Sequence, residues 1–538
     1  MSEVIAADPM PQQPVSTSAN GSSVEVFAVY GVEPEIQAYA MAKYSRSSLS
    51  MKESLNEISA QKAEKFLNTF YFQYGHRSIA DLAHIALAIE RLSILAAIVV
   101  ADEQRWDGQE RSTRYQDFKK SGYYTPNFGE TTDAAAASAS VLYHDAIASL
   151  FASYQEVSQK AFEYLASITP RPVDMKAEGY ERTMRARAFD ISRYLLPLAT
   201  NTSLGEIVNA RTLETQVGHL LSQPQREVRE LGALLKKAAT SPAYNANEES
   251  LRALVNKIRE VSPEIADQAE IELLHEVRVA PTLVKYADPN QYEIESRGEL
   301  RQAAAELMQG AAIEPAPPVD LLDTDLLEKD PLEIELASTL LYGHCHYSYR
   351  QIRQAVESDG EARRREIIDL GLRHRGKHDE LPRSFSAGQE FRFDILMDIG
   401  GFRDMHRHRR CVQIMQDFTI AHGFDTPPEI EAAGIQAEYA NAMQRAASAV
   451  KKLADAGCTE ARENAQYAIP LAFRKRTLFK MDFAEAVYIS ELRTTPAGHA
   501  SYRNVAYAMY EAVAKKYPAL AKYFRVVDVR EPVDLLKR

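Results

Sequence analysis

Short strings of this sequence recur in the same order in its two halves, and this repetition constrains the fold more than any other feature. The string Tyr194-Leu-Leu-Pro-Leu-Ala199 returns as Tyr467-Ala-Ile-Pro-Leu-Ala472, which is an offset of 273 residues. The interval from the proline of this string to a later arginine, Arg229 in the first repeat and Arg503 in the second, is kept to within one residue. Since each match alone is short, it is their shared order and spacing that predict a tandem duplication.

Two further matches support the duplication. Glu33-Pro34-Glu35-Ile36 resembles Pro331-Leu332-Glu333-Ile334, and Gln116-Asp117-Phe118 returns as Gln416-Asp417-Phe418 with an offset of 300 residues. Between the repeats lies Ala312-Ile-Glu-Pro-Ala-Pro-Pro318, a proline-rich stretch typical of a linker. We therefore predict four parts: a disordered tail over 1–22, a first module over 23–240, a helical connector with the linker over 241–318, and a second module over 319–538.

The hydrophobic pattern predicts a helix-rich α+β class in which each module packs a small sheet against long helices. Apolar residues alternate with other residues over 84–89 and 391–398, which is the period of a β-strand. Each strand then runs into a segment with a helical pattern. Long helices are expected over 133–167, 435–456 and 502–516.

Composition excludes several classes of protein. A formal charge of −12 argues against a general nucleic-acid surface. The most apolar stretch, 85–100, is interrupted by Glu90 and Arg91 and is shorter than the ~20 residues of a membrane span. The first 22 residues lack the pattern of a signal peptide, so we expect a cytoplasmic protein that makes no membrane contact.

Neither a disulfide framework nor a metal centre is expected. The three cysteines, Cys345, Cys411 and Cys458, are too few and too scattered for a disulfide framework. Cys345 lies among histidines, but the spacing of His344, His346, His374 and His378 fits no closed tetrahedral zinc site.

The second repeat contains the densest cationic cluster, His406-Arg-His-Arg-Arg410. Arginine forks bind phosphate and carboxylate oxygens in pairs, so the cluster suits a phosphorylated ligand. The alternative is a solvated helix end. In the first repeat, Glu110, Ser112 and Arg114 stand at alternate positions, which would place an acceptor, a hydroxyl and a cation on one side of an extended segment. The alternative there is a polar surface loop.

Together these motifs resemble flavin-dependent thymidylate synthases. The first repeat carries Gly75-His76-Arg77-Ser78, the Glu110 to Arg114 element, Ser192-Arg193, Asn209-Ala210-Arg211 and Glu227-Val228-Arg229. The second repeat carries Arg407-His408-Arg409, Ile469-Pro470, Leu492-Arg493 and Gly498-His499 before Tyr502-Arg503. The resemblance covers most of both halves.

The resemblance implies a reaction, a cofactor and a set of site residues. Members of the family methylate dUMP to dTMP, taking the carbon from methylenetetrahydrofolate and the hydride from FAD that NADPH has reduced. The implied FAD-binding residues are His76, Ser78, Asn209, Arg211, Arg407, His408, Arg409 and His499. The implied dUMP-binding residues are Glu110, Ser112, Arg114, Arg193 and Arg493, of which Arg114 and Arg493 are the expected catalytic residues.

Neither repeat carries the whole family signature. Where the second repeat has Arg407-His408-Arg409, the first has Asp102-Glu103-Gln104, at an offset of 305 residues rather than 300, so one of the two alignments is accidental. What one repeat lacks the other tends to keep, which suggests composite sites between the repeats and a homodimer that mimics the family's homotetramer. The rival explanation is random decay.

Two other functions stay open at this level. One is flavin-dependent alkylation of a different pyrimidine nucleotide. The other is a pseudoenzyme that binds flavin or nucleotide without turnover. Convergence of Glu110, Ser112 and Arg114 with Arg407 and Arg493 would favour an enzyme, and wide separation would favour the pseudoenzyme.

Overall fold

The computed structural model describes residues 27–29, 31–43, 50–56, 77–119, 121–130, 132–322, 331–374, 384, 391–521 and 524–536. The predicted tail and the candidate residues His76 and His378 lie outside these ranges. The first repeat and the connector contain α1 (Pro34–Lys43), α2 (Met51–Asn56), η2 (Arg77–Leu82), β1 (His84–Ser93), α4 (Ile94–Ala101), β2 (Trp106–Glu110), α5 (Ala134–Ile168), α6 (Ala177–Ser192), η3 (Arg193–Leu195), β3 (Asn201–Asn209), α7 (Ala210–Leu221), α8 (Arg226–Thr240), α9 (Glu248–Val261), α10 (Pro263–Leu273) and α11 (Gln291–Leu307).

The second repeat contains β4 (Val319–Leu321), α12 (Pro331–Tyr342), α13 (Tyr349–Ser358), α14 (Glu361–Leu372), β5 (Phe391–Asp398), α15 (Ile399–Met405), β6 (Val412–Met415), α16 (Pro428–Ala432), α17 (Gln436–Ala454), α18 (Ala461–Gln466), β7 (Arg474–Met481), α19 (Phe483–Arg493), α20 (Ala500–Lys516) and α21 (Pro518–Ala521). The predicted α+β class, rich in helix, is confirmed. None of the described helices is both long and apolar enough to cross a membrane.

Each repeat has a small antiparallel sheet. The first sheet has the order β1-β3-β2, and the second has the order β4-β5-β7-β6. β1 and β5 each lead directly into a short buried helix, α4 or α15, as the change of hydrophobic period predicts. The helices begin at Ser93 and Asp398, whose side chains accept hydrogen bonds from backbone N–H groups three residues later.

One hydrogen bond near these helix starts is conserved between the repeats with its partners exchanged. In the first repeat the hydroxyl of Ser93 donates to Glu227 on α8 at 2.6 Å. In the second repeat the hydroxyl of Ser501 on α20 donates to Asp398. Hydroxyl and carboxylate have swapped places while the bond remains, which supports a common origin for the two halves.

The repeated Leu/Ile-Pro-Leu-Ala strings meet each other around an approximate two-fold axis. Pro197 and Pro470 form an antiparallel bridge. Leu198 N donates to Ile469 O at 2.9 Å and Leu471 N donates to Leu196 O at 3.0 Å, and a further pair of bonds joins Ala199 to Tyr467 and Ala472 to Tyr194. Because these bonds are exchanged by the offset of 273, the two modules contact each other as the subunits of a symmetric dimer would.

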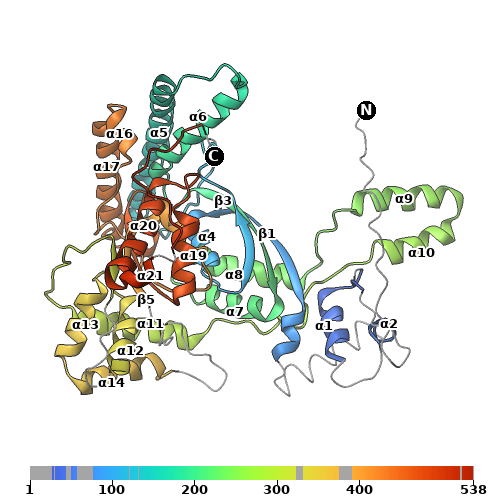
Figure 1. Cartoon of the computed structure of the whole chain (residues 1–538). Helices are drawn as coiled ribbons and strands as arrows, with labels where there is room; N and C mark the ends of the chain where they lie inside the picture. Colours follow the sequence, from blue (N-terminus) through green and yellow to red (C-terminus); the bar gives the residue numbers. More distant parts are fainter. Residues whose placement is uncertain are drawn as a thin grey trace.

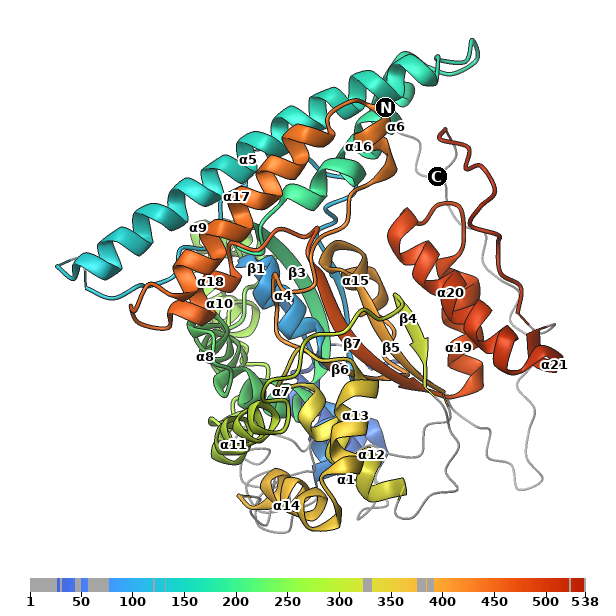
Figure 2. The same cartoon turned by 90° about the vertical axis from the view of Figure 1, so that its left-hand side faces the viewer.

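Two long helices from different repeats flank this contact. Figure 2 shows α5 and α17 lying side by side across one face of the molecule, and their contact joins the two modules along much of their length. Below them one continuous hydrophobic core contains residues of both sheets and of both strings. The tandem chain therefore has a shared core, while α9 and α10 project from the body at the right of Figure 1.

Strand register decides between the two sequence offsets. Glu110 pairs with Leu204, and Met415 pairs with Thr477; since β3 and β7 are related by 273 residues, β2 and β6 are related by 305. The register continues past the strand, because Arg111 N and Gln416 N donate to equivalent carbonyls of β3 and β7. Gln416 therefore occupies the place of Arg111 rather than Gln116, and the Gln-Asp-Phe match is accidental.

Candidate functional site

Residues of the two repeats meet at the ends of β2 and α15. Arg403 on α15 forms an ion pair with Glu110 at 2.5 Å and donates to the hydroxyl of Thr113 at 3.2 Å. All three side chains lie between the repeats, and Arg403 is buried. A predicted nucleotide-binding residue of the first repeat is thus held by an arginine that sequence reasoning missed.

Asp190 on α6 contacts two arginines and one histidine. Arg114 donates its Nε and Nη2 to the two carboxylate oxygens at 3.0 and 3.2 Å. Nε of Arg193 lies 3.5 Å and Nδ1 of His499 lies 3.1 Å from the same Oδ1 of Asp190. His499 comes from the second repeat and also bonds Tyr194 through Nε2 at 2.7 Å. The predicted residues Arg114, Arg193 and His499 therefore form one buried cluster across the repeat boundary.

Two arginines and a histidine surround the carboxylate of Asp190. Burial alone would raise the pKa of Asp190, but the charges of His499, Arg193 and Arg114 hold it well below its usual value. Nη2 of Arg193 has no hydrogen-bond partner among the described residues, and the other nearby carboxylate, Asp404, lies 3.8 Å from its Nη1. A buried donor without a partner is costly, so Arg193 is a natural contact for an anionic ligand.

Tyr502 joins Arg114 to the distal arginine of the second repeat. Arg114 donates Nη1 to the hydroxyl of Tyr502 at 3.1 Å and Nη2 to the carbonyl of Ala497 at 3.0 Å. The guanidinium carbons of Arg114 and Arg493 lie 5.7 and 5.5 Å from the centre of the Tyr502 ring. One aromatic ring thus holds the two expected catalytic arginines near each other, although they are 379 residues apart in the sequence.

The predicted cofactor triplet follows α15. His408 is buried and accepts a hydrogen bond from Arg493 at 2.7 Å between Nε2 and Nε. Arg409 lies over the ring of Trp106 at 4.8 Å and pairs with Asp107 at 2.9 Å. Arg407 is exposed and lines a narrow pocket with Trp106, Glu110, Arg403 and Arg409. Two arginines of the triplet therefore line the same pocket as residues of the first repeat.

The remaining predicted cofactor residues lie at η2 and the start of α7. Asn209 caps α7 by accepting from Thr212 N at 2.8 Å, Arg211 pairs with Asp81 at 3.3 Å, and Ser78 is exposed on η2. β2 connects this region to the triplet, because Trp106 pairs with Val208, the residue before Asn209. His76 lies outside the described residues.

One local expectation about the nucleotide motif is wrong. The extended segment ends at Glu110, and 113–115 form a turn in which the hydroxyl of Ser112 accepts from Arg114 N at 3.2 Å. The turn sends the guanidinium of Arg114 toward Asp190, away from the line of β2. The expectation that Glu110, Ser112 and Arg114 lie on one side of an extended segment is therefore wrong. The bond between Arg114 N and the Ser112 side chain stabilises a turn in place of a longer strand.

The structure adds residues to the site that were not among the predicted site residues, although Tyr502 lies in one of the quoted motifs. Asp190 and Asp404 supply the carboxylates, Tyr502 the shared ring, and Arg403 the partner of Glu110. A weak signal existed, since Asp190 lies three residues before Arg193 and Arg403 three before His406 on helical segments, which places each pair on one face.

The place related to this cluster by the approximate two-fold axis lacks its charges. Gln466 stands where the first repeat has Arg193, and Gln225 stands where the second has His499; their side chains contact each other at 3.5 Å. Ile98 replaces Arg403 and Leu220 replaces Arg493, both buried among apolar neighbours. Only one of the two related places has the cationic cluster.

The sequence was compared with known families and proteins. The family described as thymidylate synthase complementing protein matches over residues 29–241 and 327–519, well over half of the chain. Relatives of the same tandem length are among the matches. A UPF0159 protein of Chlamydia muridarum is 26% identical over 534 residues, covering 94% of this chain and 92% of that protein. A UPF0159 protein of Thermoplasma acidophilum is 26% identical over 526 residues, covering 91% and 94%.

A single-module relative and a solved structure also match. The flavin-dependent thymidylate synthase of Clostridium tetani is 25% identical over 229 residues, covering 42% of this chain and 86% of that protein. The crystal structure of a flavin-dependent thymidylate synthase of Helicobacter pylori complexed with FAD and dUMP has a TM-score of 0.23 and 17% identity, covering 38% of this chain and 89% of that one. The two matched regions, with a sheet and long helices in each, lead to one conclusion: this chain belongs to the thymidylate synthase complementing protein family and carries the family's module twice.

Proposed function

We propose that the chain is an FAD-dependent enzyme of the thymidylate synthase type, which methylates dUMP to dTMP with methylenetetrahydrofolate as carbon donor and NADPH as the source of reducing equivalents. Membership of the family supports the reaction class, and the single-module relative of Clostridium tetani is named for it. The observation that carries the proposal is the meeting of Arg114 and Arg193 with His499 and Arg493 around Asp190 and Tyr502.

The donor set suits a nucleotide monophosphate. Arg193 and Arg114 would bind the phosphate, because Arg193 has an unused buried donor and Arg114 is fixed beside it by Asp190. Glu110 would accept from the nucleotide once Arg403 is drawn away, and Ser112 would contribute its hydroxyl. Arg493 would lie near the uracil carbonyl, where a cation stabilises the enolate character that makes C5 nucleophilic. Arg114 and Arg493 thus have the catalytic roles in this proposal.

The residues around the second-repeat triplet fit a flavin. Nε of Arg403 is buried without a hydrogen-bond partner among the described residues, and Arg407 and Arg409 present cations beside an indole. Arg407, His408 and Arg409 would hold FAD with help from His499, His76, Ser78, Asn209 and Arg211. FAD supplies the hydride chemistry when bound. The protein residues orient the reactants and exclude water, and orientation alone can contribute roughly 7 to 11 kcal/mol.

In this proposal the site is composite, since both repeats contribute to it. The second repeat adds Arg493 to the nucleotide side, and the first repeat adds Ser78, Asn209 and Arg211 to the cofactor side. Two chains in a homodimer would match the four modules of the family's homotetramer. Loss of charge at the two-fold related place then explains why each repeat keeps only part of the family signature.

The first test is a visible absorbance spectrum of the purified protein titrated with dUMP. A bound-flavin spectrum that shifts on adding dUMP, followed by tritium release from C5-labelled dUMP, is the expected result. Flavin with no response to dUMP would contradict this substrate and favour another pyrimidine nucleotide. Bound flavin and dUMP without tritium release would favour a pseudoenzyme, and a protein that cannot be loaded with FAD would overturn the proposal.

A further inference from the structure

A second cavity lies between the repeats next to the cluster around Asp190. It has a volume of about 610 Å³ and is bounded by α6, the start of α20 and the C-terminal segment around Val533 and Leu535. Arg187 and Arg503 lie in its polar part, and apolar residues such as Ile191 form the rest of its wall. We call it the tail cavity.

Arg503 reaches the tail cavity with most of its guanidinium unused. The side chain is 4% exposed, and Nε donates to the carbonyl of Thr494 at 3.1 Å. Among the described residues no carboxylate pairs with Arg503, and its two Nη groups have no hydrogen bond. Burial lowers the pKa of Arg503, and the nearby charge of Arg187 lowers it further.

Arg187 attaches the C-terminal segment to the cavity. Its Nε donates to the carbonyl of Leu535 at 3.2 Å, and its Nη2 lies 3.5 Å from the carbonyl of Asp534. These contacts seat the apolar side chains of Val533 and Leu535 on the cavity wall. The lining of the cavity therefore combines two arginines with an apolar cover from the C-terminal segment.

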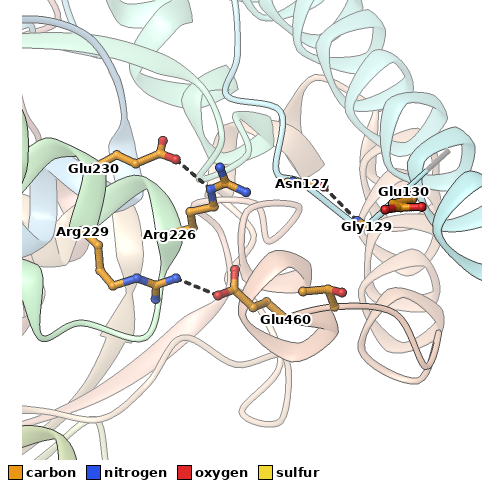
Figure 3. Close-up of a pocket in the computed structure, with 8 residues that line it drawn as sticks. Asn127, Gly129, Glu130, Arg226, Arg229, Glu230 and Glu460 are labelled. Carbon is orange, nitrogen blue, oxygen red and sulfur yellow. Dashed lines mark hydrogen bonds and ion pairs between the residues drawn. The ribbon is translucent and has the colours of Figure 1, made fainter.

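The pocket related to the tail cavity by the approximate two-fold axis does not have two arginines at the equivalent positions. There Arg229, the counterpart of Arg503, forms an ion pair with Glu460 at 2.7 Å and donates to the carbonyl of Gln223 at 3.0 Å, as Figure 3 shows for the ion pair. Glu460 is the counterpart of Arg187 at the offset of 273. One half has an arginine and a glutamate, and the other has two arginines.

Three acids line the tail cavity, and two of them already have cationic partners in other contacts. Asp425 is paired with Arg474 through a bond of 2.7 Å, and Asp190 is shared by Arg114, Arg193 and His499. Glu429 is the remaining carboxylate of the lining. The start of α20, a helix of 17 residues, adds its positive end, because its first residue lines the cavity and His499 makes no capping bond with its side chain.

From the charge reversal, the buried unpaired Arg503 and the apolar cover, we propose that the tail cavity binds a small organic anion. Its carboxylate or phosphate head would lie between Arg187 and Arg503, and its apolar body would pack against Ile191, Val533 and Leu535. The anion would supply the negative charge that Glu460 supplies in the other half. The tail cavity shares Asp190 and His499 with the proposed nucleotide site, but Arg187 and Arg503 have no role in that site, and the proposal does not depend on the proposed reaction.

Isothermal titration calorimetry with phenyl phosphate and with benzoate tests the site. At least one probe should bind the wild-type protein, and its Kd should rise at least about tenfold in Arg187→Glu and in Arg503→Gln, since each loses a charged hydrogen bond. Arg229→Gln, in the related pocket, is the matched control and should bind as wild type. Binding by phenyl phosphate alone would identify a phosphate head, and binding by benzoate a carboxylate head.

Three results would overturn the proposal: neither probe binds, Arg187→Glu binds as tightly as wild type, or dUMP competes with the probe. The third result would mean that the probe occupies the nucleotide site. Arg187→Glu should stay folded, because it recreates the ion pair found between Arg229 and Glu460, and its thermal unfolding temperature should not fall. If the unfolding temperature of Arg187→Glu does fall, the probe affinity of the more conservative variant Arg503→Gln tests the proposal instead. A protein that binds a probe without binding dUMP would contradict the proposed reaction and leave the tail site standing.

Discussion

Arg493 donates a hydrogen bond from Nε to Nε2 of His408 at 2.7 Å. Since Nε2 accepts, the neutral imidazole carries its proton on Nδ1, which faces Glu485 at 3.6 Å. Burial lowers the pKa of His408, which favours this neutral form. The bond links an expected cofactor residue to an expected catalytic arginine and holds Arg493 beside Tyr502.

Replacing Arg493 should affect turnover more than binding. In Arg493→Ala we expect kcat for tritium release to fall by about 100-fold or more, because a cation aimed at developing negative charge is lost. The Kd for dUMP should change much less, as Arg193 and Arg114 remain. Arg493→Lys, which keeps the charge but loses the bond from Nε, should retain an intermediate rate. Equal losses in kcat and in dUMP affinity would contradict this division of roles.

The acid limit of activity should lie below pH 6.5, the ordinary pKa of histidine, because the pKa of His408 is lowered. As pH falls through the pKa of the folded protein, protonation would remove the acceptor and place a cation beside Arg493. The rate of tritium release between pH 5 and 8 measures this limit. In His408→Gln, whose side chain can still accept from Arg493, the rate of tritium release should no longer fall at low pH. An unchanged fall would mean that another group titrates.

Arg114→Ala and Arg407→Ala should each abolish activity although the residues lie in different repeats. Arg114 is fixed by Asp190 and Tyr502 on the nucleotide side, and Arg407 lies on the proposed cofactor side. Tritium release and bound flavin content are the measurements. Arg226→Ala, whose partner Glu230 lies on the same exposed helix face, is the control and should keep full activity. Full activity in either of the first two variants would contradict the composite site.

Calorimetry should find one dUMP site per chain. The two-fold related place has Gln466, Gln225 and Ile98 where the proposed site has Arg193, His499 and Arg403. A phosphate there would lack the charged side chains that Arg193 and Arg403 supply at the proposed site. A stoichiometry of two sites per chain would show that the neutral side chains suffice.

Residues 1–318 and 319–538, divided at the end of the predicted linker, should fold together but not apart. The backbone N–H of Leu471 donates to the carbonyl of Leu196 across the boundary, and both residues lie in one core shared by the repeats. Either half alone would expose that surface and its unpaired backbone groups. Co-expression should give a soluble complex that binds flavin, whereas each half expressed alone should aggregate. A soluble, monomeric second half would support an independent domain.

Glu206→Gln should stabilise the protein more as pH rises. Burial raises the pKa of Glu206 to about 7, and one of its carboxylate oxygens has no hydrogen bond among the described residues. A raised pKa in the folded protein means that stability is lost as pH rises from the ordinary value of 4.5 through 7. Urea unfolding should show a gain of up to about 3 kcal/mol at pH 8 and little gain at pH 5. An equal gain at both would exclude titration as the cause.

Much of the local structure could be predicted from the sequence. Alternation over 84–89 and 391–398 predicted β1 and β5, and the long helical patterns predicted α5, α17 and α20 with ends within a few residues. These features depend on a period of two or of 3.6 residues, which a short window contains. The second-repeat cluster of histidine and arginine was visible for the same reason.

The arrangement of charges around the sheets was not predictable in this way. Alternation puts Arg392 and Asp394 on the face of β5 opposite its apolar residues, where solvent is the default. In the structure both are buried, because α12 and α13 cover that face and Asp394 bonds Tyr342 at 2.6 Å and Arg476 at 2.8 Å. A strand's period says which residues share a face but says nothing about what covers it.

The sequence by itself determined the duplication, the family motifs and the strand and helix periods. Only the tertiary structure decided that Asp190 holds Arg114 and His499, that Tyr502 joins Arg114 to Arg493, and that the Gln-Asp-Phe match is accidental. The physical reason is distance along the chain. Local preferences are set by neighbouring residues, whereas these contacts join segments hundreds of residues apart and form only when the two repeats pack on a shared core.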